Sequence, residues 1–487
     1  MMSNFLPMAT SFFPDASTET GLYILISLLY LAGALGFILS LKWMSDAKTA
    51  RKGIFAGEIG FVLAIIGTLL LPVITTTGYI YIAVAMLIGA AIGVPLGLLV
   101  PMTAMPQRIA LSHAFGALAA GLVGIAKFYD ATPDIGWFVM AVLGIEIVLG
   151  ALVFTGSLMA AGKLQEVKWL AQRPIVFPLQ KTLNFAVLGV ALAGVIILAA
   201  DPSQIWAIPM IIVAGLAFGI LLIVPIGGAD MPTVIALLNA YAGIAAALLG
   251  FVLENNLLIV AGALDGMSGL ILSIIMCRAM NRSFRNVLFG AFGATEVAGG
   301  DQEIGSIRSA SFDEAGDLLK MARLVVIVPG YGMAVAQAQH KVRELADTLE
   351  KEGVEVKYAI HPVAGRMPGH MNVLLAEANV PYEQLLDMED INPEFPQVDV
   401  VLVLGANDVV NPAARHDQSS PIYGMPILDV DKAATIMVVK RSMRPGFAGV
   451  ENELFFNEKT LMVFGDAKDV MGELITEVAG NRDSINV

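Results

Sequence analysis

Long apolar runs constrain this chain of 487 residues more than any other feature. A helix that crosses the hydrocarbon core of a bilayer needs about 20 predominantly apolar residues. Nine runs before residue 280 meet this requirement. They predict an α-helical polytopic membrane bundle of nine spans, at about residues 20–41, 53–72, 78–101, 107–126, 136–156, 183–200, 204–226, 231–252 and 257–278.

Charge separates this apolar part from the rest of the chain. Residues 1–290 contain 12 acidic and 13 basic residues, and the remainder contains 30 and 16, so the two parts have net charges near +1 and −14. We therefore predict a transmembrane domain over residues 1–286, a glycine-containing linker over 287–320 and a soluble domain over 321–487. The acidity of the last part argues against nucleic acid as a partner.

Basic residues indicate the orientation, because lysine and arginine accumulate in cytoplasmic loops. The loops on one side of the predicted bundle contain a single basic residue, Lys127, and those on the other side contain twelve. This places the C-terminal domain in the cytoplasm and the N-terminus on the opposite side. No basic residue precedes Lys42, so we expect no cleaved signal peptide. The twelve are Lys42, Lys48, Arg51, Lys52, Arg108, Lys163, Lys168, Arg173, Lys181, Arg278, Arg282 and Arg285.

In the soluble part, apolar β-rich runs alternate with helical patterns. This alternation is typical of a parallel sheet covered on both faces, and it predicts a Rossmann-like doubly wound α/β domain. The predicted strands lie near 323–329, 354–360, 398–404, 433–440 and 460–464, and the predicted helices near 333–350, 371–379 and 467–479.

A glycine turn, Gly330-Tyr-Gly-Met-Ala-Val335, follows the first predicted strand and begins a helix. Its glycines allow a backbone to approach a pyrophosphate closely, and the helix N-terminus offers free N–H groups. The same pattern also occurs in ordinary strand-to-helix turns. The second strand ends in Ala359-Ile-His-Pro362, without the acid that would hold the ribose hydroxyl of NAD.

Another set of residues, two cations followed by a hydroxyl, is suited to NADP. Lys440-Arg441-Ser442 follows the strand-like run Ile436–Val439, and Arg444 lies nearby. Two cations and a hydroxyl at the carboxyl end of a strand are suited to a 2′-phosphate, although solvated basic residues at a strand end would give the same pattern. The turns Gly365–Gly369 and Gly446–Gly449 are either phosphate-binding loops or ordinary loops.

Polar residues inside predicted spans are candidates for a proton path, because burying them in hydrocarbon is unfavourable. His113 is the only histidine before the soluble part, and Asn239 follows Asp230 by nine residues, about 13 Å along a helix. An interhelical hydrogen bond for Asn239 and a helix cap for Asp230 remain the alternatives. Three further acids inside spans, Glu58, Glu146 and Asp265, have no assigned role. The single cysteine, Cys277, is interpreted as a packing residue, and no metal site is predicted.

Several long motifs resemble the β subunit of proton-translocating nicotinamide nucleotide transhydrogenase. The resemblance covers most of the chain, and it includes Met102–Pro106 with His113, but about twenty residues at the N-terminus match nothing. The motifs are Gly330–Gln339, His361–Glu377, Gly405–Asp408, Asn411–Ala414, Lys440–Ser442, Gly227–Pro232 and Met276–Ser283.

The resemblance implies hydride transfer between NAD(H), bound by a separate α subunit, and NADP(H), bound by this chain, coupled to inward proton movement. It implies a dimer of αβ units in a prokaryotic inner (plasma) membrane. A rival hypothesis from another class is a channel or transporter regulated by a nucleotide-sensing domain. A potassium-selectivity sequence and an internal repeat, which would favour that rival, are not evident in the sequence.

The resemblance also implies roles for individual residues. His113, Asn239, Asp230 and Asp408 would take part in catalysis and coupling, with Asp408 near the nicotinamide and residues 446–450 forming a lid loop. The implied cofactor-binding residues are Gly330, Tyr331, Gly332, Val363, Ala364, Gly365, Arg366, Pro368, Gly369, Gly405, Ala406, Asn407, Asp408, Lys440, Arg441, Ser442, Gly446, Phe447, Ala448 and Gly449.

Overall fold

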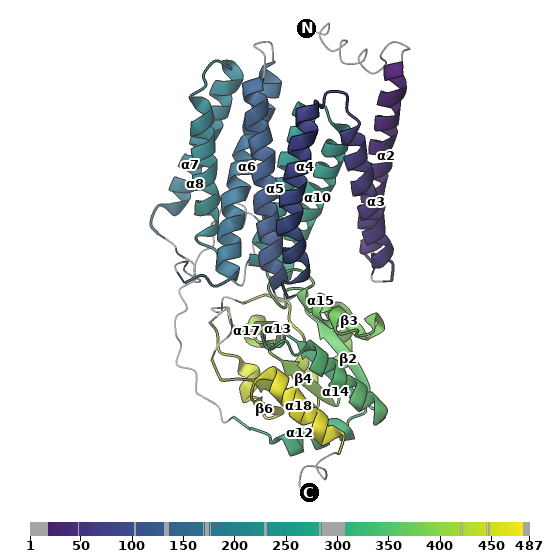
Figure 1. The fold of residues 1–487 in the computed structure, drawn as a ribbon. Coiled ribbons are helices and arrows are strands. Elements are labelled where there is room, and N and C mark those ends of the chain that lie inside the picture. Colours follow the sequence, from purple (N-terminus) through teal and green to yellow (C-terminus); the bar gives the residue numbers. More distant parts are fainter. Residues whose placement is uncertain are drawn as a thin grey trace.

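A helical bundle and a helix-covered sheet lie end to end in a computed structural model of the chain (Figure 1). The structure describes residues 18–46, 48–101, 104–130, 136–168, 170, 175, 177–227, 231–281, 284, 307–418, 420, 422–444, 446 and 449–480. Asp230, Phe447 and Ala448, all predicted site residues, lie outside these ranges.

Nine helices of the described bundle occupy the nine predicted ranges. Eight of them are long and apolar enough to cross a membrane. The exception is α8, whose 17 residues are at the lower limit of about 17 to 25 for a spanning helix. The helices are α2 (Thr18–Met44), α3 (Ala50–Leu69), α4 (Thr76–Leu98), α5 (Met105–Asp130), α6 (Trp137–Leu164), α7 (Gln180–Ala200), α8 (Ala207–Ile223), α9 (Met231–Val252) and α10 (Asn256–Ala279).

The bundle exposes apolar side chains. Leu98 and Leu99 are 79% exposed, and α4 has no buried residue. A water-soluble protein would bury such a surface, whereas hydrocarbon solvates it. The helices run alternately up and down, so that the loops α2–α3, α4–α5 and α6–α7 lie on the side of the sheet (Figure 1). The described basic residues of these three loops therefore lie on the side of the C-terminal part.

Glycines bring α9 and α10 into close contact. A Cβ atom on Gly243 would lie 2.1 Å from the backbone nitrogen of Gly266, and one on Gly262 would lie 2.4 Å from that of Ala247. Side chains at these positions would force the helices apart, so the small residues allow backbone-to-backbone packing, as in other membrane helix pairs.

The C-terminal part contains a six-stranded parallel sheet in the order β3-β2-β1-β4-β5-β6. This order is doubly wound and confirms the predicted Rossmann-like domain. The five predicted strands are present, and the sequence pattern missed only the three-residue edge strand β3. The strands are β1 (Leu324–Pro329), β2 (Glu355–Ile360), β3 (Leu385–Asp387), β4 (Val400–Leu404), β5 (Thr435–Lys440) and β6 (Thr460–Phe464).

The two faces of the sheet are covered differently. Helices cover the face that includes Val325 and Ile327, whereas short helical turns and loops with Phe395 and Leu454 cover the other. The predicted helix 333–350 is divided at Gln337, whose φ of +50° interrupts the helical backbone. The helices are α12 (Phe312–Met321), α13 (Tyr331–Ala336), α14 (Gln339–Lys351), α15 (His370–Glu377), α16 (Met388–Ile391), α17 (Ala413–His416) and α18 (Ala467–Val478), with 3₁₀ turns Tyr382–Gln384, Asn392–Gln397, Asp408–Val410, Val430–Lys432 and Glu453–Phe456.

Helix α12 begins within the range predicted as a linker and ends one residue beyond it. Its buried Ala315 and Leu319 belong to the same core as Leu474 of α18, and Ser309 pairs with Met462 of β6. The division into residues 1–286, 287–320 and 321–487 stays a proposal, and these contacts favour a start of the third part near residue 307.

Candidate functional site

Two glycine loops cross at the carboxyl ends of β1 and β4, where the strand order of the sheet reverses. The amide of Gly330 donates to the Leu404 carbonyl at 2.9 Å, and the amide of Gly332 donates to the Gly405 carbonyl at 3.0 Å. A Cβ atom on Gly330 would lie 2.4 Å from the backbone of Ala406. Gly405 has a φ of +67°, which favours glycine. The predicted glycine turn therefore packs on the second loop, at the crevice where open α/β sheets bind ligands.

The segment after β4 is held against the loop that follows β5. Asn452 donates from Nδ2 to the Asn407 backbone oxygen at 3.0 Å. Gly446 lies so close that a Cβ atom there would be 2.4 Å from Asn407 Nδ2 and 2.8 Å from Asp408 Oδ1. Residues from two separate predicted motifs, 405–408 and 446–449, thus meet at one edge of the sheet.

Lys440 lies at the same edge, at the end of β5. Its Nζ donates to the Arg444 carbonyl at 2.8 Å and lies 4.4 Å from the centroid of the Phe455 ring. Burial lowers the pKa of Lys440, and the nearby Asp408 carboxylate opposes this shift. Arg441 and Ser442 follow on the exposed surface. A half-buried ammonium beside an exposed guanidinium and a hydroxyl forms a set of donors suited to a phosphate.

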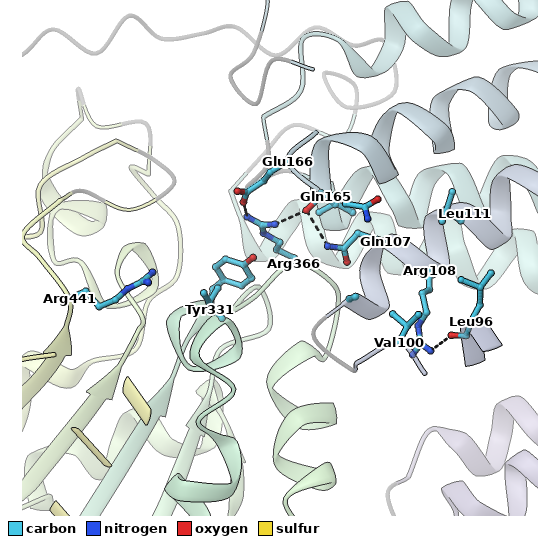
Figure 2. A pocket seen from close by; sticks show the side chains of 13 residues that line it. Leu96, Val100, Gln107, Arg108, Leu111, Gln165, Glu166, Tyr331, Arg366 and Arg441 are labelled. Carbon is cyan, nitrogen blue, oxygen red and sulfur yellow. Dashed lines mark hydrogen bonds and ion pairs between the residues drawn. The ribbon is translucent and has the colours of Figure 1, made fainter. Parts of the chain in front are cut away.

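Arg366 is directed away from the glycine crossing and toward the bundle. Its guanidinium carbon lies 4.3 Å from the centroid of the Tyr331 ring. Its Nη1 donates to the Leu164 carbonyl at 2.8 Å, and its Nη2 donates to Glu166 Oε1 at 2.5 Å (Figure 2). Leu164 is the last residue of α6. This predicted nucleotide-binding arginine therefore joins the C-terminal part to the bundle.

Two neutral histidines support the loop that contains Arg366. His370 Nδ1 accepts the Arg366 amide at 3.0 Å, and burial together with the Arg366 charge lowers the pKa of His370 to about 4. His361 Nε2 donates to the Pro426 carbonyl at 2.8 Å while its Nδ1 accepts the Val363 amide. Burial lowers the pKa of His361 to about 4. Both imidazoles are therefore uncharged at neutral pH and act as structural anchors.

A cavity of about 670 Å³ lies between the bundle and the sheet. Figure 2 shows Arg366 and Tyr331 from the C-terminal part opposite Gln107 and Arg108 of α5. Arg108 itself donates to the carbonyls of Leu96 and Gly97 at the end of α4. The full lining is Leu96, Val100, Ala104, Gln107, Arg108, Leu111, Leu164, Gln165, Glu166, Tyr331, Val335, Arg366 and Arg441.

A second contact joins the two parts at the end of α10. Asn281 Nδ2 donates to the Tyr423 carbonyl at 2.8 Å. The Asn281 side chain packs on Gly424, where a Cβ atom would lie 2.3 Å from Nδ2. Asn281 belongs to the predicted motif 276–283. The carboxyl edge of the sheet thus faces the ends of α6 and α10.

Within the bundle, His113 and Asn239 lie together, on α5 and α9. The Asn239 side chain lies beside His113, and its Nδ2 donates to Asp265 Oδ1 on α10 at 3.1 Å. We call His113, Asn239 and Asp265 the His–Asn–Asp cluster. The interhelical hydrogen bond considered as an alternative for Asn239 is therefore present, and it is made to an ionisable group, Asp265.

Other charged groups in the bundle lie elsewhere. Glu146 on α6 is fully buried against Gly124, and neither of its oxygens has a hydrogen-bond partner among the described residues. Glu58 on α3 is exposed. Lys163 is buried at the end of α6 and donates to the carbonyls of Ile223, Val224 and Ile226, at 2.7 to 3.1 Å. These bonds cap the end of α8, which is the ordinary role of a lysine at a helix C-terminus.

The structure gathers most predicted site residues into two places. One is the sheet edge with Gly330, Gly405, Asp408, Lys440 and their neighbours, and the other is the His–Asn–Asp cluster. The sequence pattern missed Glu166, Asn281 and the cavity between the two parts, because interdomain contacts leave no periodic signal. Glu166 was nevertheless visible as an acid between the basic residues Lys163 and Lys168.

Comparisons with known proteins find similarity over most of the chain. A family model described as "NAD(P) transhydrogenase beta subunit" matches residues 26–477. Curated relatives from Rhodospirillum rubrum and from one of its strains, each called "NAD(P) transhydrogenase subunit beta", are 50% identical over 458 residues. The match covers 92% of this chain and 97% of each relative.

Proposed function

This chain belongs to the NAD(P) transhydrogenase beta subunit family, and we propose that it binds NADP(H) and couples hydride exchange with NAD(H) to inward proton movement. NAD(H) is bound by an α subunit, and the working unit is a dimer of αβ pairs in a prokaryotic inner membrane, with the C-terminal part in the cytoplasm. One observation supports this proposal above the others: the ligand-binding edge of the sheet faces the helix ends of the bundle, and Arg366 joins them.

The residues at the sheet edge fit NADP(H). Lys440, Arg441 and Ser442 would hold the 2′-phosphate, and no acid ends β2 to compete for that position. A side chain at Gly330, Gly332 or Gly405 would clash with the backbone of the other loop, so the glycines allow the two loops to cross at the crevice. In the same proposal, residues Val363–Gly369 contact the diphosphate, and residues Gly446–Gly449 close over it.

Hydride transfer itself requires little acid–base chemistry from this chain. When bound, the nicotinamide supplies the carbon that donates or accepts hydride, so the protein contributes position and electrostatics. Asp408, in the turn after β4, is placed to respond to the positive charge of an oxidised ring, and its interaction with Lys440 would transmit that response.

Proton movement provides the thermodynamic bias. One proton moving through about 150 mV contributes on the order of 3.5 kcal/mol, which shifts an equilibrium by a few hundredfold. His113 and Asn239 would take up and release the proton, and Asp230, immediately before α9, would communicate their state to the nucleotide-binding part. The coupling then depends on contacts between the two parts, such as those of Arg366 and Asn281.

The test is NADH-dependent reduction of an NADP analogue by vesicles that contain this chain and an α partner. We expect hydride transfer accompanied by acidification of one compartment, and we expect an uncoupler to change the rate. A channel or transporter with a nucleotide sensor would show no hydride transfer with or without the uncoupler, and that result would refute the proposal.

Glu166→Gln is expected to strengthen NADP(H) binding. Glu166 competes for the guanidinium of Arg366, which the proposal assigns to the nucleotide. Because the Glu166 side chain is 61% exposed, solvent screens the pair, and the expected gain in affinity is only roughly two- to fivefold. Calorimetry on the purified chain measures it.

Glu383→Gln is the matched control, since Glu383 forms another ion pair between the two parts, with Lys48 at 3.7 Å, but lies away from the nucleotide-binding set. An affinity that is unchanged or weaker in Glu166→Gln would mean that the pair does not compete with the nucleotide.

A further inference from the structure

Asp265 is the one member of the His–Asn–Asp cluster to which the proposed function assigns no role. It lies on α10, and Asn239 Nδ2 is 3.1 Å from its Oδ1 and 3.3 Å from its backbone oxygen. Asp265 and His113 also interact electrostatically. Three helices that are distant in the sequence therefore bring an imidazole, an amide and a carboxyl group together.

Asp265 sets the orientation of the Asn239 side-chain amide. An ionised carboxylate only accepts hydrogen bonds, so the NH₂ group of Asn239 must face Asp265. The amide oxygen is then left to accept an N–H from the imidazole of His113. The backbone oxygen of Asp265 accepts from the same NH₂ group, so the carboxylate and this carbonyl fix the orientation together.

Close helix packing holds the two side chains in contact. The Gly243–Gly266 crossing brings the backbones of α9 and α10 together one turn from Asn239. A Cβ atom on Gly269, which also faces α9, would lie 2.8 Å from Asn239 Nδ2. Larger residues at these glycines would separate Asn239 from Asp265.

The position of Asp265 is energetically unfavourable, which indicates that the residue has a function. It lies in the middle of a membrane helix and is exposed on the surface of this chain, where an ionised group in hydrocarbon is costly. Glu146, another acid in the helices around α5, contacts Gly124, which is eleven residues from His113 or about 16 Å along the helix. Among the acids that the structure describes in the bundle, Asp265 is the one that interacts with His113, so it is suited to compensate a charge there.

We propose that Asp265 is a positioning residue for the proton carrier His113, because it orients Asn239 and supplies the negative charge that compensates protonated His113. This inference rests on the proposed role of His113 in coupling. It assigns to α10 a direct part in proton movement, in addition to its contact with the nucleotide-binding part through Asn281.

The experiment compares three substitutions in the full chain, assembled with its α partner in vesicles. Asp265→Asn keeps an acceptor oxygen but removes the charge, Asp265→Leu removes both, and Asp265→Glu keeps both. Proton movement is measured by a pH-sensitive dye, and hydride exchange is measured with an NAD analogue on NADP(H) that stays bound. Glu58→Gln, which removes another intramembrane acid on α3, is the control.

We expect proton movement to fall at least roughly tenfold in Asp265→Asn and Asp265→Leu and to recover substantially in Asp265→Glu, while exchange on bound nucleotide changes little. Glu58→Gln should behave like the unmodified chain. Unchanged proton movement in Asp265→Asn would overturn the proposal, and so would a parallel loss of exchange, which indicates a merely structural role. If the unmodified chain itself moves no proton during hydride transfer, the proposed function fails and this inference fails with it.

Discussion

His113→Asn is expected to abolish coupled proton movement while hydride exchange through bound nucleotide continues. Asparagine keeps a hydrogen-bonding group toward Asn239 but cannot bind a proton near neutral pH. Since His113 lies inside the bundle and the nicotinamides would meet beyond the sheet edge, the variant can act only through the coupling between the two parts. We expect proton movement to fall by roughly a hundredfold or more, as when a general acid–base group is removed.

The measurement records the pH change in vesicles and, in parallel, exchange between an NAD analogue and bound NADP(H). His340→Asn is the matched control, because His340 is an exposed histidine on α14. Intact proton movement in His113→Asn would exclude His113 from the proton path. Equal loss of both activities would indicate damage to the fold and not to coupling.

Replacing Lys440 and Arg441 together by alanine is expected to remove the preference for NADP(H) over NAD(H). Each charge-assisted contact to a phosphate contributes about 1.5 to 3 kcal/mol, although the exposure of Arg441 reduces its share. We therefore expect NADP(H) affinity to fall by roughly a hundredfold, or about 3 kcal/mol. NAD(H) has no 2′-phosphate, so its weak binding should change little.

Calorimetry on residues 310–487, which we expect to fold as a soluble domain, measures both affinities. Lys432→Ala is the control, because Lys432 is a surface lysine that pairs with Asp429 and lies outside the proposed site. Equal NADP(H) affinity in the double variant and the unmodified domain would remove Lys440 and Arg441 from the site.

Much of the fold was predictable because its elements are long and periodic. The nine apolar runs and the five buried strands depend on local composition, which the sequence displays directly. Two departures have local causes: β3 has only three residues, too few for a periodic signal, and Gln337 adopts a left-handed conformation that divides the predicted helix. Residues 287–320 were interpreted as a linker because of their glycines and interspersed acids, and these local features did not reveal α12.

Candidate site residues were also visible in the sequence, but their partners were not. The motifs containing Gly330, Gly405 and Lys440 pointed to a nucleotide-binding edge, and His113 and Asn239 to a path inside the bundle. Arg366 was expected to bind phosphate, and it also binds Glu166 and the end of α6. Asp265 was visible only as an unexplained acid inside a span.

The amino-acid sequence by itself determined the membrane bundle and the doubly wound sheet, and it predicts the side of the membrane to which the basic loops belong. These properties follow from hydrophobicity, residue periodicity and charge, which act over neighbouring residues. Only the tertiary structure decided that the sheet edge faces the bundle through Arg366 and Asn281, and that Asp265 joins His113 and Asn239. Those contacts depend on how helices and domains pack against each other. Some of them join residues more than a hundred positions apart in the sequence, such as Asn281 and Tyr423. A local sequence pattern does not encode contacts over such a separation.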